Sequence, residues 1–277
     1  MSAVPALLNG APAGGDLLLS RGLHYGDGVF RTLLKYDGQL IDFKLQIIKI
    51  VRDAAALNLD VAADLLRSEA EAVGAAASRG VIKLMLLRAG AGRGYRGDSR
   101  QADRLALCYP LPEYPADYWR QGIAAFRSDL KLGSQPLLAG IKHLNRLEQV
   151  LGSRDWPEEA AEGILCDEHL MPVCGTRSNL FWVRGGRLHT PALDACGVAG
   201  VMRDKVLACA AALGIQADVA GRPWHELSEA DEVFVTNSLI GIWPLRSLEQ
   251  CHWPAPGVLT RKLMTALRHP LINSAMQ

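Results

Sequence analysis

The alternation of apolar and polar positions in the first part of the chain predicts a small domain that mixes strands and helices. The runs 81–88 and 104–109 are rich in leucine and β-branched residues, which is typical of buried strands. Residues 31–35 also favour a strand, and Tyr36-Asp37-Gly38 follows it as a turn. Helical spacing of apolar residues covers about 45–57 and 62–77. We therefore predict a small α/β domain over residues 1–110.

A connecting segment follows this first domain. The stretch Pro110-Leu-Pro-Glu-Tyr-Pro115 holds three prolines in six residues. Proline lacks a backbone N–H and disfavours a helix interior, so this stretch does not fit a regular element. We place an interdomain linker at residues 111–121.

The second half of the chain alternates short strands with polar turns. Two of its predicted strands flank Arg184-Gly185-Gly186, a hairpin turn signal. Helices are predicted over about 144–151, where Leu144, Leu147 and Leu151 would form a buried stripe, and over 201–213. The predicted strands cover residues 123–126, 163–167, 180–183, 187–190 and 232–236. This pattern predicts a larger domain over residues 122–277 with a curved or barrel-like sheet, in a chain of the α+β class.

Charge and cysteine content narrow the partners that this protein can have. Thirty basic and 29 acidic side chains leave a formal charge of +1, so no global field gathers nucleic acid or an acidic membrane surface. An anionic small molecule must therefore be held by local cations. The six cysteines form no C-x-x-C pair and no metal-ligand cluster, which favours a reducing, cytoplasmic setting without a bound metal. No run approaches the roughly 18 apolar residues of a membrane helix.

Lys142 is the first residue whose position suggests chemistry. It lies in Gly140-Ile-Lys-His-Leu-Asn-Arg-Leu-Glu148, just ahead of a predicted helix. Burial there would penalise the ammonium and leave a neutral amine able to form a Schiff base. The alternative is a solvated lysine at a helix start, and the spacing alone does not decide between the two.

Two further motifs have the features of an anion site. Gly197-Val-Ala-Gly200 opens directly into the helix predicted from Val201, and backbone N–H groups at a helix start attract phosphate. The predicted strand that begins near Asp231 ends in Thr236-Asn237-Ser238, whose small polar side chains could complete a phosphate cup. Glycines before helices and polar residues after strands are also common turn formers, so each motif alone leaves both interpretations open.

Taken together, these segments resemble the aminodeoxychorismate lyases. The most specific match is Leu138-Ala-Gly-Ile-Lys-His-Leu-Asn-Arg-Leu-Glu-Gln-Val150, which is similar to the lysine segment of that family. The other matching segments occur in the same order as in the family: Arg21-Gly-Leu-His-Tyr-Gly-Asp-Gly-Val-Phe30, Gly92-Arg-Gly-Tyr95, Gly175-Thr-Arg-Ser-Asn-Leu-Phe-Trp182, Gly197 to Arg203, and Asp231 to Ser238. The resemblance covers nearly the whole chain.

The resemblance implies a pyridoxal 5′-phosphate (PLP) enzyme of fold type IV, with two domains and usually a homodimer. It implies that Lys142 carries PLP as a Schiff base and transfers protons. It places the phosphate at the backbone of Val201 and Met202 and at the strand end of Asn237 and Ser238. The family has an Arg or Lys on its first helix for the same phosphate, and the alignment puts Lys49 there. Gln46 and Ile47 stand where the family usually has His-Leu.

One position departs from the pattern of many relatives. They carry a Glu five residues before the equivalent of Asn179, where it pairs with the pyridine nitrogen of PLP; here that residue is Cys174. A thiol supports a protonated pyridine poorly, so either another residue supplies the contact or the enzyme works with a weaker electron sink. A nucleophilic Cys174 is the less favoured alternative, because no adjacent His motif supports it and buried structural cysteine is commoner.

The implied reaction converts 4-amino-4-deoxychorismate into 4-aminobenzoate and pyruvate. The substrate amine would displace Lys142, and the freed Lys142 would remove the C4 proton before the enolpyruvyl group leaves. Formation of an aromatic product would favour the reaction even with a weak sink. The two substrate carboxylates need local cations, and arginine suits them best. The candidates for substrate binding are Arg31, Arg93 and Arg177, followed by His24, Tyr25 and Tyr109.

Two alternatives stay open at this stage. A branched-chain or D-amino-acid aminotransferase of the same fold would share the first proton abstraction but would need a keto acid to accept nitrogen. Cys174 and the segment Asn145-Arg-Leu-Glu148 favour the lyase over this alternative. The other alternative is a non-catalytic PLP-binding protein, which would bind the cofactor without turnover.

Overall fold

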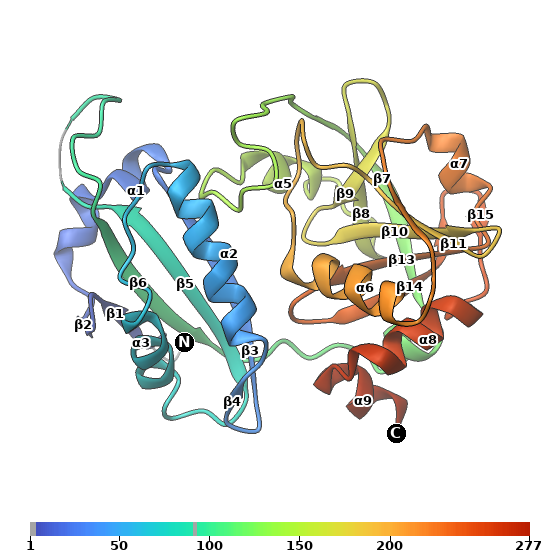
Figure 1. Cartoon of the computed structure of the whole chain (residues 1–277), viewed down its shortest axis with the longest axis horizontal. Coiled ribbons are helices and arrows are strands. Elements are labelled where there is room, and N and C mark those ends of the chain that lie inside the picture. Colours follow the sequence, from blue (N-terminus) through green and yellow to red (C-terminus); the bar gives the residue numbers. More distant parts are fainter. Residues whose placement is uncertain (1–3, 91–92) are drawn as a thin grey trace. The chain divides into compact units, whose positions relative to one another are not determined.

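The computed structural model describes residues 4–90 and 93–277, which form two compact units (Figure 1). Unit 1 comprises residues up to Glu113 together with Ile141–Asn145, and unit 2 comprises Tyr114–Gly140 and Arg146–Gln277. The chain first passes from unit 1 to unit 2 between Glu113 and Tyr114, inside the segment 111–121 that was predicted as a linker. That segment also includes the short helix α4 (Asp117–Arg120). Unlike the sequence-based division, the structure groups the Lys142 segment with unit 1.

Unit 1 is an antiparallel six-stranded sheet in the order β2-β1-β6-β5-β3-β4. Its long strands cover the predicted ones and extend the first of them at both ends. Helix α2 lies along one face of the sheet (Figure 1). The elements are β1 (Ala6–Leu8), β2 (Ala11–Pro12), the 3-10 helix η1 (Gly15–Leu19), α1 (Arg21–Tyr25), β3 (Gly28–Tyr36), β4 (Gln39–Leu40), α2 (Phe43–Ala56), α3 (Leu65–Val73), β5 (Gly80–Arg88) and β6 (Ala102–Tyr109).

The core of unit 1 forms between that sheet face and its helices. Val29 and Leu33 of β3 alternate with residues on the other face and pack with Ile50 and Ala54 of α2. The buried face of α2 also carries Gln46, Lys49 and Asp53 at helical spacing. Polar groups at buried positions need partners, so this stripe marks a polar site within the core.

Unit 2 is built on a nine-stranded sheet that closes on itself. The path runs β12-β11-β10-β13-β14-β7-β8-β9, and β9 pairs with β10 as well as with β8. The ring β10-β13-β14-β7-β8-β9 is therefore a barrel, which confirms the barrel-like expectation. Its strands are β7 (Ile123–Leu132), β8 (Ala160–Asp167), β9 (Pro172–Gly175), β10 (Asn179–Arg184), β11 (Arg187–Thr190), β12 (Ala217–Val219), β13 (Glu232–Asn237), β14 (Gly241–Leu248) and β15 (Cys251–His252).

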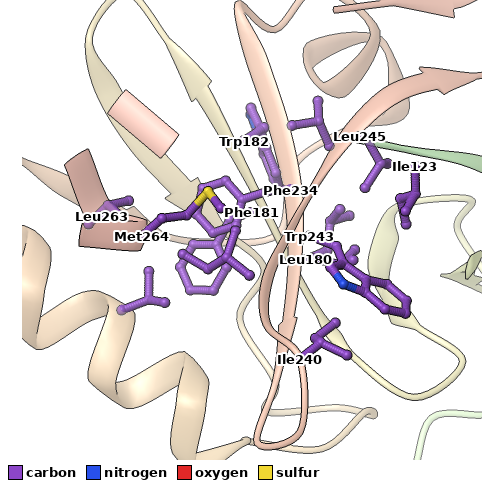
Figure 2. Close-up of a cluster of buried hydrophobic side chains, with 14 of the residues drawn as sticks. Ile123, Leu180, Phe181, Trp182, Phe234, Ile240, Trp243, Leu245, Leu263 and Met264 are labelled. Atoms are coloured by element: carbon purple, nitrogen blue, oxygen red, sulfur yellow. The ribbon is translucent and has the colours of Figure 1, made fainter. Parts of the chain in front are cut away.

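Aromatic and aliphatic side chains fill the core of unit 2 (Figure 2). Phe181 and Phe234 face each other across β10 and β13 with ring centroids 5.1 Å apart. Leu263 and Met264 join the same cluster from α8. Its helices besides α4 are α5 (Leu147–Gly152), α6 (Val201–Ala212), α7 (Trp224–Ser228), α8 (Val258–Leu267) and α9 (Pro270–Met276).

The predicted buried stripe on the helix after Lys142 is wrong. Helix α5 begins only at Leu147, and its buried residue is Gly152. Leu147 is 74% exposed and Leu151 50% exposed. Because the helix is short and starts late, the leucine spacing does not align with the barrel surface, and both leucines face outward.

Candidate active site

Lys142 lies on a segment that is bonded along strand β3. Phe30 N donates to Lys142 O at 2.9 Å, Leu144 N donates to Gly28 O at 3.0 Å, and Val29 and His143 form an antiparallel bridge. The side chain is half-buried, and its Nζ lies 4.6 Å from the centroid of the Phe30 ring. The lysine is thus held by backbone bonds on both sides and by a cation–π contact at its tip.

A second lysine reaches the same aromatic ring. Lys83 of β5 has its Nζ 5.0 Å from the Phe30 centroid, and it stands opposite Thr32, the next residue of β3 on that face. Burial lowers the pKa of Lys83 from its ordinary value of 10.5. Sequence reasoning did not identify Lys83, although a lysine inside an otherwise apolar strand was the available signal.

Beneath Lys142, on the core side of the sheet, three charged side chains meet. Asp53 of α2 forms ion pairs with Arg31 of β3 and with Lys49, one helical turn earlier. The other Asp53 contact is the backbone N–H of Lys142, which donates to Oδ2 at 3.2 Å. Burial lowers the pKa of Lys49, while the Asp53 charge opposes that shift. Arg31 and Lys49, both singled out from the sequence, are thus brought together by Asp53, which sequence reasoning did not identify as a site residue.

In unit 2, Asn179 joins the two motifs predicted to bind phosphate. It begins β10 in register with Thr236 at the end of β13. Its side-chain Nδ2 donates to Val198 O at 2.7 Å, and its Oδ1 accepts from Gly200 N at 3.1 Å. Asn179 therefore links the two motifs: its side chain contacts the glycine turn before α6, and its backbone is in register with Thr236 at the strand end. Gly140, two residues before Lys142 in the chain, also pairs with this turn.

The start of α6 is suited to an anion. Its N-cap is Gly200, which has no side chain to cap the helix, and the first helical residues are Val201 and Met202. Backbone N–H groups in a first helical turn have no partner within the helix, so they and the helix dipole favour a phosphate. A side chain at position 200 would fill this space, since an added Cβ would lie 2.3 Å from Asn179 Oδ1.

At the strand end, the side chain of Asn237 closes a turn. Its Oδ1 accepts from Leu239 N at 2.9 Å and Ile240 N at 3.0 Å, and its Nδ2 donates to Arg177 O at 3.2 Å. Ser238 is half-buried, and its carbonyl lies 3.3 Å from His269 Nε2. The Asn237 side-chain oxygen is therefore engaged within the turn, and N–H groups are what this strand end can offer to a phosphate.

Cys174 lies on β9 opposite Asn179 and is buried. Burial strongly raises the pKa of its thiol, and the nearby positive charge of Arg146 opposes this only in part. The thiol is therefore neutral at pH 7, which disfavours a nucleophilic role.

The carboxylate of Glu162 lies near Cys174 but is fully engaged. Glu162 of β8 is 0% exposed. Its Oε1 accepts from Gly163 N, Thr176 N and Thr176 Oγ1 at 3.0, 3.1 and 2.6 Å, and its Oε2 accepts from Ser178 Oγ at 2.7 Å. Glu162 thus fixes the turn between β9 and β10. Its signal in the sequence was an acidic residue at the start of an apolar run.

The remaining residues predicted to bind substrate lie in both units. In unit 1, Tyr25 Oη accepts from Gly94 N at 2.9 Å, and Arg21 donates to Gly94 O and Tyr95 O, so the first motif meets Gly94 and Tyr95 of the second. Gly92, the first residue of that second motif, lies outside the described residues. His24 and Arg93 are exposed, and Tyr109 at the end of β6 is 37% exposed. In unit 2, the Arg177 guanidinium donates to Ala161 O at 2.8 Å and lies 5.5 Å from the Trp156 ring centroid.

The described residues form neither a membrane-spanning helix nor a cluster of metal-ligating side chains. Within residues 4–90 and 93–277, no helix combines the length and apolar character needed to cross a bilayer. The same residues contain no group of three or more His, Cys, Asp or Glu side chains able to hold a metal ion.

Known proteins resemble this chain along almost its full length. An aminodeoxychorismate lyase from Vibrio harveyi is 31% identical over 265 residues, which cover 92% of this chain and 97% of the relative. The crystal structure of a 4-amino-4-deoxychorismate lyase from Pseudomonas aeruginosa superposes with a TM-score of 0.91 at 40% identity, covering 96% of this chain and 99% of the other. A D-alanine aminotransferase from Bacillus licheniformis is 28% identical over 261 residues, or 91% of this chain and 90% of the relative.

A family model supports the same grouping. The model for class IV amino-transferases matches residues 28–248, a range that includes β3, Lys142, Asn179 and the start of α6. The chain therefore belongs to the class IV amino-transferase family, in the part of it that resembles the aminodeoxychorismate lyases.

Proposed function

We propose that this protein is a PLP-dependent lyase that converts 4-amino-4-deoxychorismate into 4-aminobenzoate and pyruvate. The observation that carries the proposal is a lysine amine fixed on a backbone-bonded segment, Lys142, in a chain that matches lyases of this activity over more than nine-tenths of its length. The two products together contain all the atoms of the substrate, so the reaction needs no second reactant.

The residues present suit a phosphorylated aldehyde cofactor. Lys142 offers a primary amine, and the uncapped start of α6 offers N–H donors at Val201 and Met202. Ser238, the backbone of Asn237 and the cation Lys49 complete the proposed phosphate ligands. When bound, PLP supplies an electron sink that stabilises negative charge where a proton is lost.

Gly200 provides a test of the phosphate site that does not depend on turnover. Gly200→Ala is expected to weaken PLP binding about tenfold, because the new Cβ displaces the Asn179 amide that orders the turn, at a cost of about 1.4 kcal/mol. Dissociation constants from PLP titration of the cofactor-free protein give the comparison. Gly133→Ala is the matched control, since the nearest neighbour of a Cβ added at Gly133 would be Glu148 Oε1 at 3.6 Å, an ordinary contact distance. Equal affinities for the two variants would remove the turn from the phosphate site.

Lys142 is the residue that we assign to proton transfer. Once the substrate amine takes its place on the cofactor, the free amine can accept the C4 proton. The Phe30 ring, 4.6 Å from Nζ, then holds the resulting ammonium by a cation–π contact. The side chain is thereby kept close to its starting position, ready to return the proton.

Local cations must bind the two substrate carboxylates. Lys83 shares the Phe30 ring with Lys142, so we add it to the candidates. Arg93 and Arg177 remain proposed carboxylate ligands, together with Tyr25, His24 and Tyr109 as pocket residues. Arg31 is 3% exposed and paired with Asp53. A role for Arg31 in substrate binding stays a prediction, and its burial favours it less than Arg93 and Arg177.

The role of Lys83 predicts a change in KM rather than in kcat. Lys83→Met is expected to raise KM for 4-amino-4-deoxychorismate about 10-fold to 100-fold, the loss of one charge-assisted contact, with a smaller change in kcat. Binding requires the ammonium, so the wild-type KM should rise as pH climbs through the lowered pKa of Lys83, below 10.5. Steady-state kinetics against pH measure both effects. Lys44→Met, an exposed change on α2, is the control, and a KM for Lys83→Met that matches this control would exclude the contact.

The main alternative is an aminotransferase, which the similarity to a D-alanine aminotransferase keeps in view. Position 174 argues against it. Burial keeps the Cys174 thiol neutral, and the nearby Glu162 carboxylate already accepts four hydrogen bonds. A ring nitrogen without an anionic partner gives a weaker sink. Formation of an aromatic product compensates for that weakness in the lyase reaction, whereas amino transfer offers no such driving force.

We further propose a homodimer in a reducing cytoplasm. Leu147, Val150 and Leu151 expose 74%, 62% and 50% of their surface on α5, an apolar patch that a second copy could cover. Each of the six cysteines lies in the described part of the chain and carries a free thiol, as expected in a reducing compartment. Light scattering at several protein concentrations tests the dimer.

The activity is tested by incubating the PLP-loaded protein with 4-amino-4-deoxychorismate. We expect 4-aminobenzoate and pyruvate in equal amounts, with no dependence on an added keto acid. Exchange of nitrogen between D-alanine and a keto acid, with neither lyase product formed, would instead identify an aminotransferase. Binding of PLP without either activity would identify a binding protein.

A further inference from the structure

Asp53 occupies a central position in unit 1 that the proposed reaction does not yet explain. It lies on the buried face of α2 and is 2% exposed. A buried carboxylate is costly unless charged or hydrogen-bonding groups surround it. Asp53 has such groups from three directions: the guanidinium of Arg31, the ammonium of Lys49 and the backbone N–H of Lys142.

The contact with Lys142 fixes the backbone of the lysine itself. Phe30 N and Gly28 O already hold the segment along β3 through Lys142 O and Leu144 N. The Lys142 N–H points instead to Asp53 Oδ2, at 3.2 Å. One carboxylate thus ties together helix α2, strand β3 and the lysine segment, and charge-assisted bonds of this kind are the stronger ones.

The negative charge of Asp53 offsets part of the positive charge around it. Arg31 and Lys49 are both buried and contribute two positive charges against the single negative charge of Asp53. Burial already lowers the pKa of Lys49, and Arg31 lowers it further, whereas Asp53 raises it. Loss of the carboxylate would leave two adjacent buried cations beside the backbone of Lys142.

We propose that Asp53 is a positioning residue that sets both the place and the charge environment of Lys142. This inference rests on the proposed function, because it concerns the nitrogen that joins Lys142 to PLP. Asp53 bonds the backbone of Lys142 and is accompanied by the cations Arg31 and Lys49. Lys83 lies at the Phe30 ring that Lys142 also contacts, and His143 is next to Lys142 in the chain. The negative charge of Asp53 favours the protonated form of the Lys142 nitrogen.

Two variants distinguish the effect of Asp53 on the charge near Lys142 from its effect on the position of Lys142. Asp53→Asn keeps an oxygen that can accept from Lys142 N–H but removes the charge. The midpoint for protonation of the Lys142–PLP nitrogen, read from the visible absorbance of the loaded protein against pH, is expected to fall by about one unit, because a nearby negative charge is lost. Asp53→Ala also removes the acceptor, and amide hydrogen exchange of peptide 138–146 in the cofactor-free protein should then accelerate at least about tenfold.

A double variant guards against a merely structural effect. Adding Arg31→Met to Asp53→Asn removes one of the two buried cations, so the absorbance midpoint should recover by more than half. If Asp53→Asn leaves the midpoint unchanged, the electrostatic role is refuted. If Asp53→Ala leaves the exchange unchanged, the positioning role is refuted. Should Asp53→Asn fail to fold, the double variant and the exchange measurement still decide both points.

Failure of the proposed function would look different. A wild-type protein without any Lys142-dependent absorbance of PLP would overturn the cofactor assignment and the electrostatic part that depends on it. The exchange measurement needs no cofactor and would still test the contact between Asp53 and Lys142.

Discussion

Lys142→Ala is expected to lower the formation of 4-aminobenzoate and pyruvate by at least about a thousandfold, since both covalent attachment and proton transfer are lost. Backbone bonds to Phe30 N and through Asp53 remain in this variant, so the segment should keep its place. The variant should also lose the visible absorbance of cofactor bound through a lysine. Single-turnover kinetics with purified protein measure the rate, and the spectrum measures attachment.

Lys142→Arg is the control for charge. It retains a cation over the Phe30 ring but offers no neutral amine at accessible pH, because arginine stays protonated. Equal inactivity of the two variants is expected. Retention of a tenth or more of the wild-type rate by Lys142→Ala would show that another residue transfers the proton.

Glu162→Ala is expected to destabilise the protein by about 3 kcal/mol, the scale for removing a buried charged hydrogen-bond acceptor from several donors. Four buried hydrogen bonds from Gly163, Thr176 and Ser178 would be lost in unit 2. Urea unfolding followed by tryptophan fluorescence gives the free energy of unfolding. The loss should be accompanied by weaker PLP binding, because the turn that Glu162 fixes leads directly into Asn179.

A companion variant separates charge from shape. Glu162→Gln keeps the size of the side chain and one acceptor oxygen, so its loss should be less than that of Glu162→Ala. A loss below about 1 kcal/mol for Glu162→Ala would mean that water or neighbouring groups satisfy the turn, and that Glu162 does not organise it.

The strands and long helices of unit 1 follow directly from the sequence pattern. The run rich in leucine and β-branched residues at 81–88 forms β5 (Gly80–Arg88), and the periodic stretch at 45–57 forms α2 (Phe43–Ala56). Helix α3 is shorter than predicted because it ends at Gly74, although the alanines continue beyond it. Local periodicity is enough for such elements because each buries one continuous face.

Other elements depend on contacts that are distant in sequence. Strand β14 contains Pro244, which cannot donate to a ladder, and it was not predicted. It forms because β13 pairs with it on one side and β7 on the other. The exposed Leu147 and Leu151 show the converse case, in which a helical pattern of leucines is present without an inward face.

The site was predicted where motifs are long and was missed where one residue acts alone. The segment around Lys142 and the glycine turn at 197–200 could be identified because several residues match together. Asp53, Lys83 and Glu162 are single charged residues in apolar stretches, and the sequence does not tell whether such a residue is buried. Arg31 lies 22 residues from Asp53 in the chain, and Thr176 and Ser178 lie 14 and 16 residues from Glu162.

The role of Cys174 illustrates a limit of resemblance. The family pattern identifies the position but not what replaces its usual carboxylate. The structure answers part of this, since the thiol is buried and the nearby Glu162 carboxylate already accepts four hydrogen bonds. The surroundings of this residue thus add to the similarity with known lyases in favouring the lyase over amino transfer.

The most direct test of the account is a competition in one sample. The PLP-loaded protein would receive 4-amino-4-deoxychorismate, D-alanine and 2-oxoglutarate together, and 4-aminobenzoate and glutamate would be quantified over the same interval. We expect 4-aminobenzoate, matched by newly formed pyruvate, to exceed glutamate by at least about a hundredfold, a difference of about 2.7 kcal/mol in the activation barriers. Glutamate formed at an equal or greater rate would contradict the assignment as a lyase.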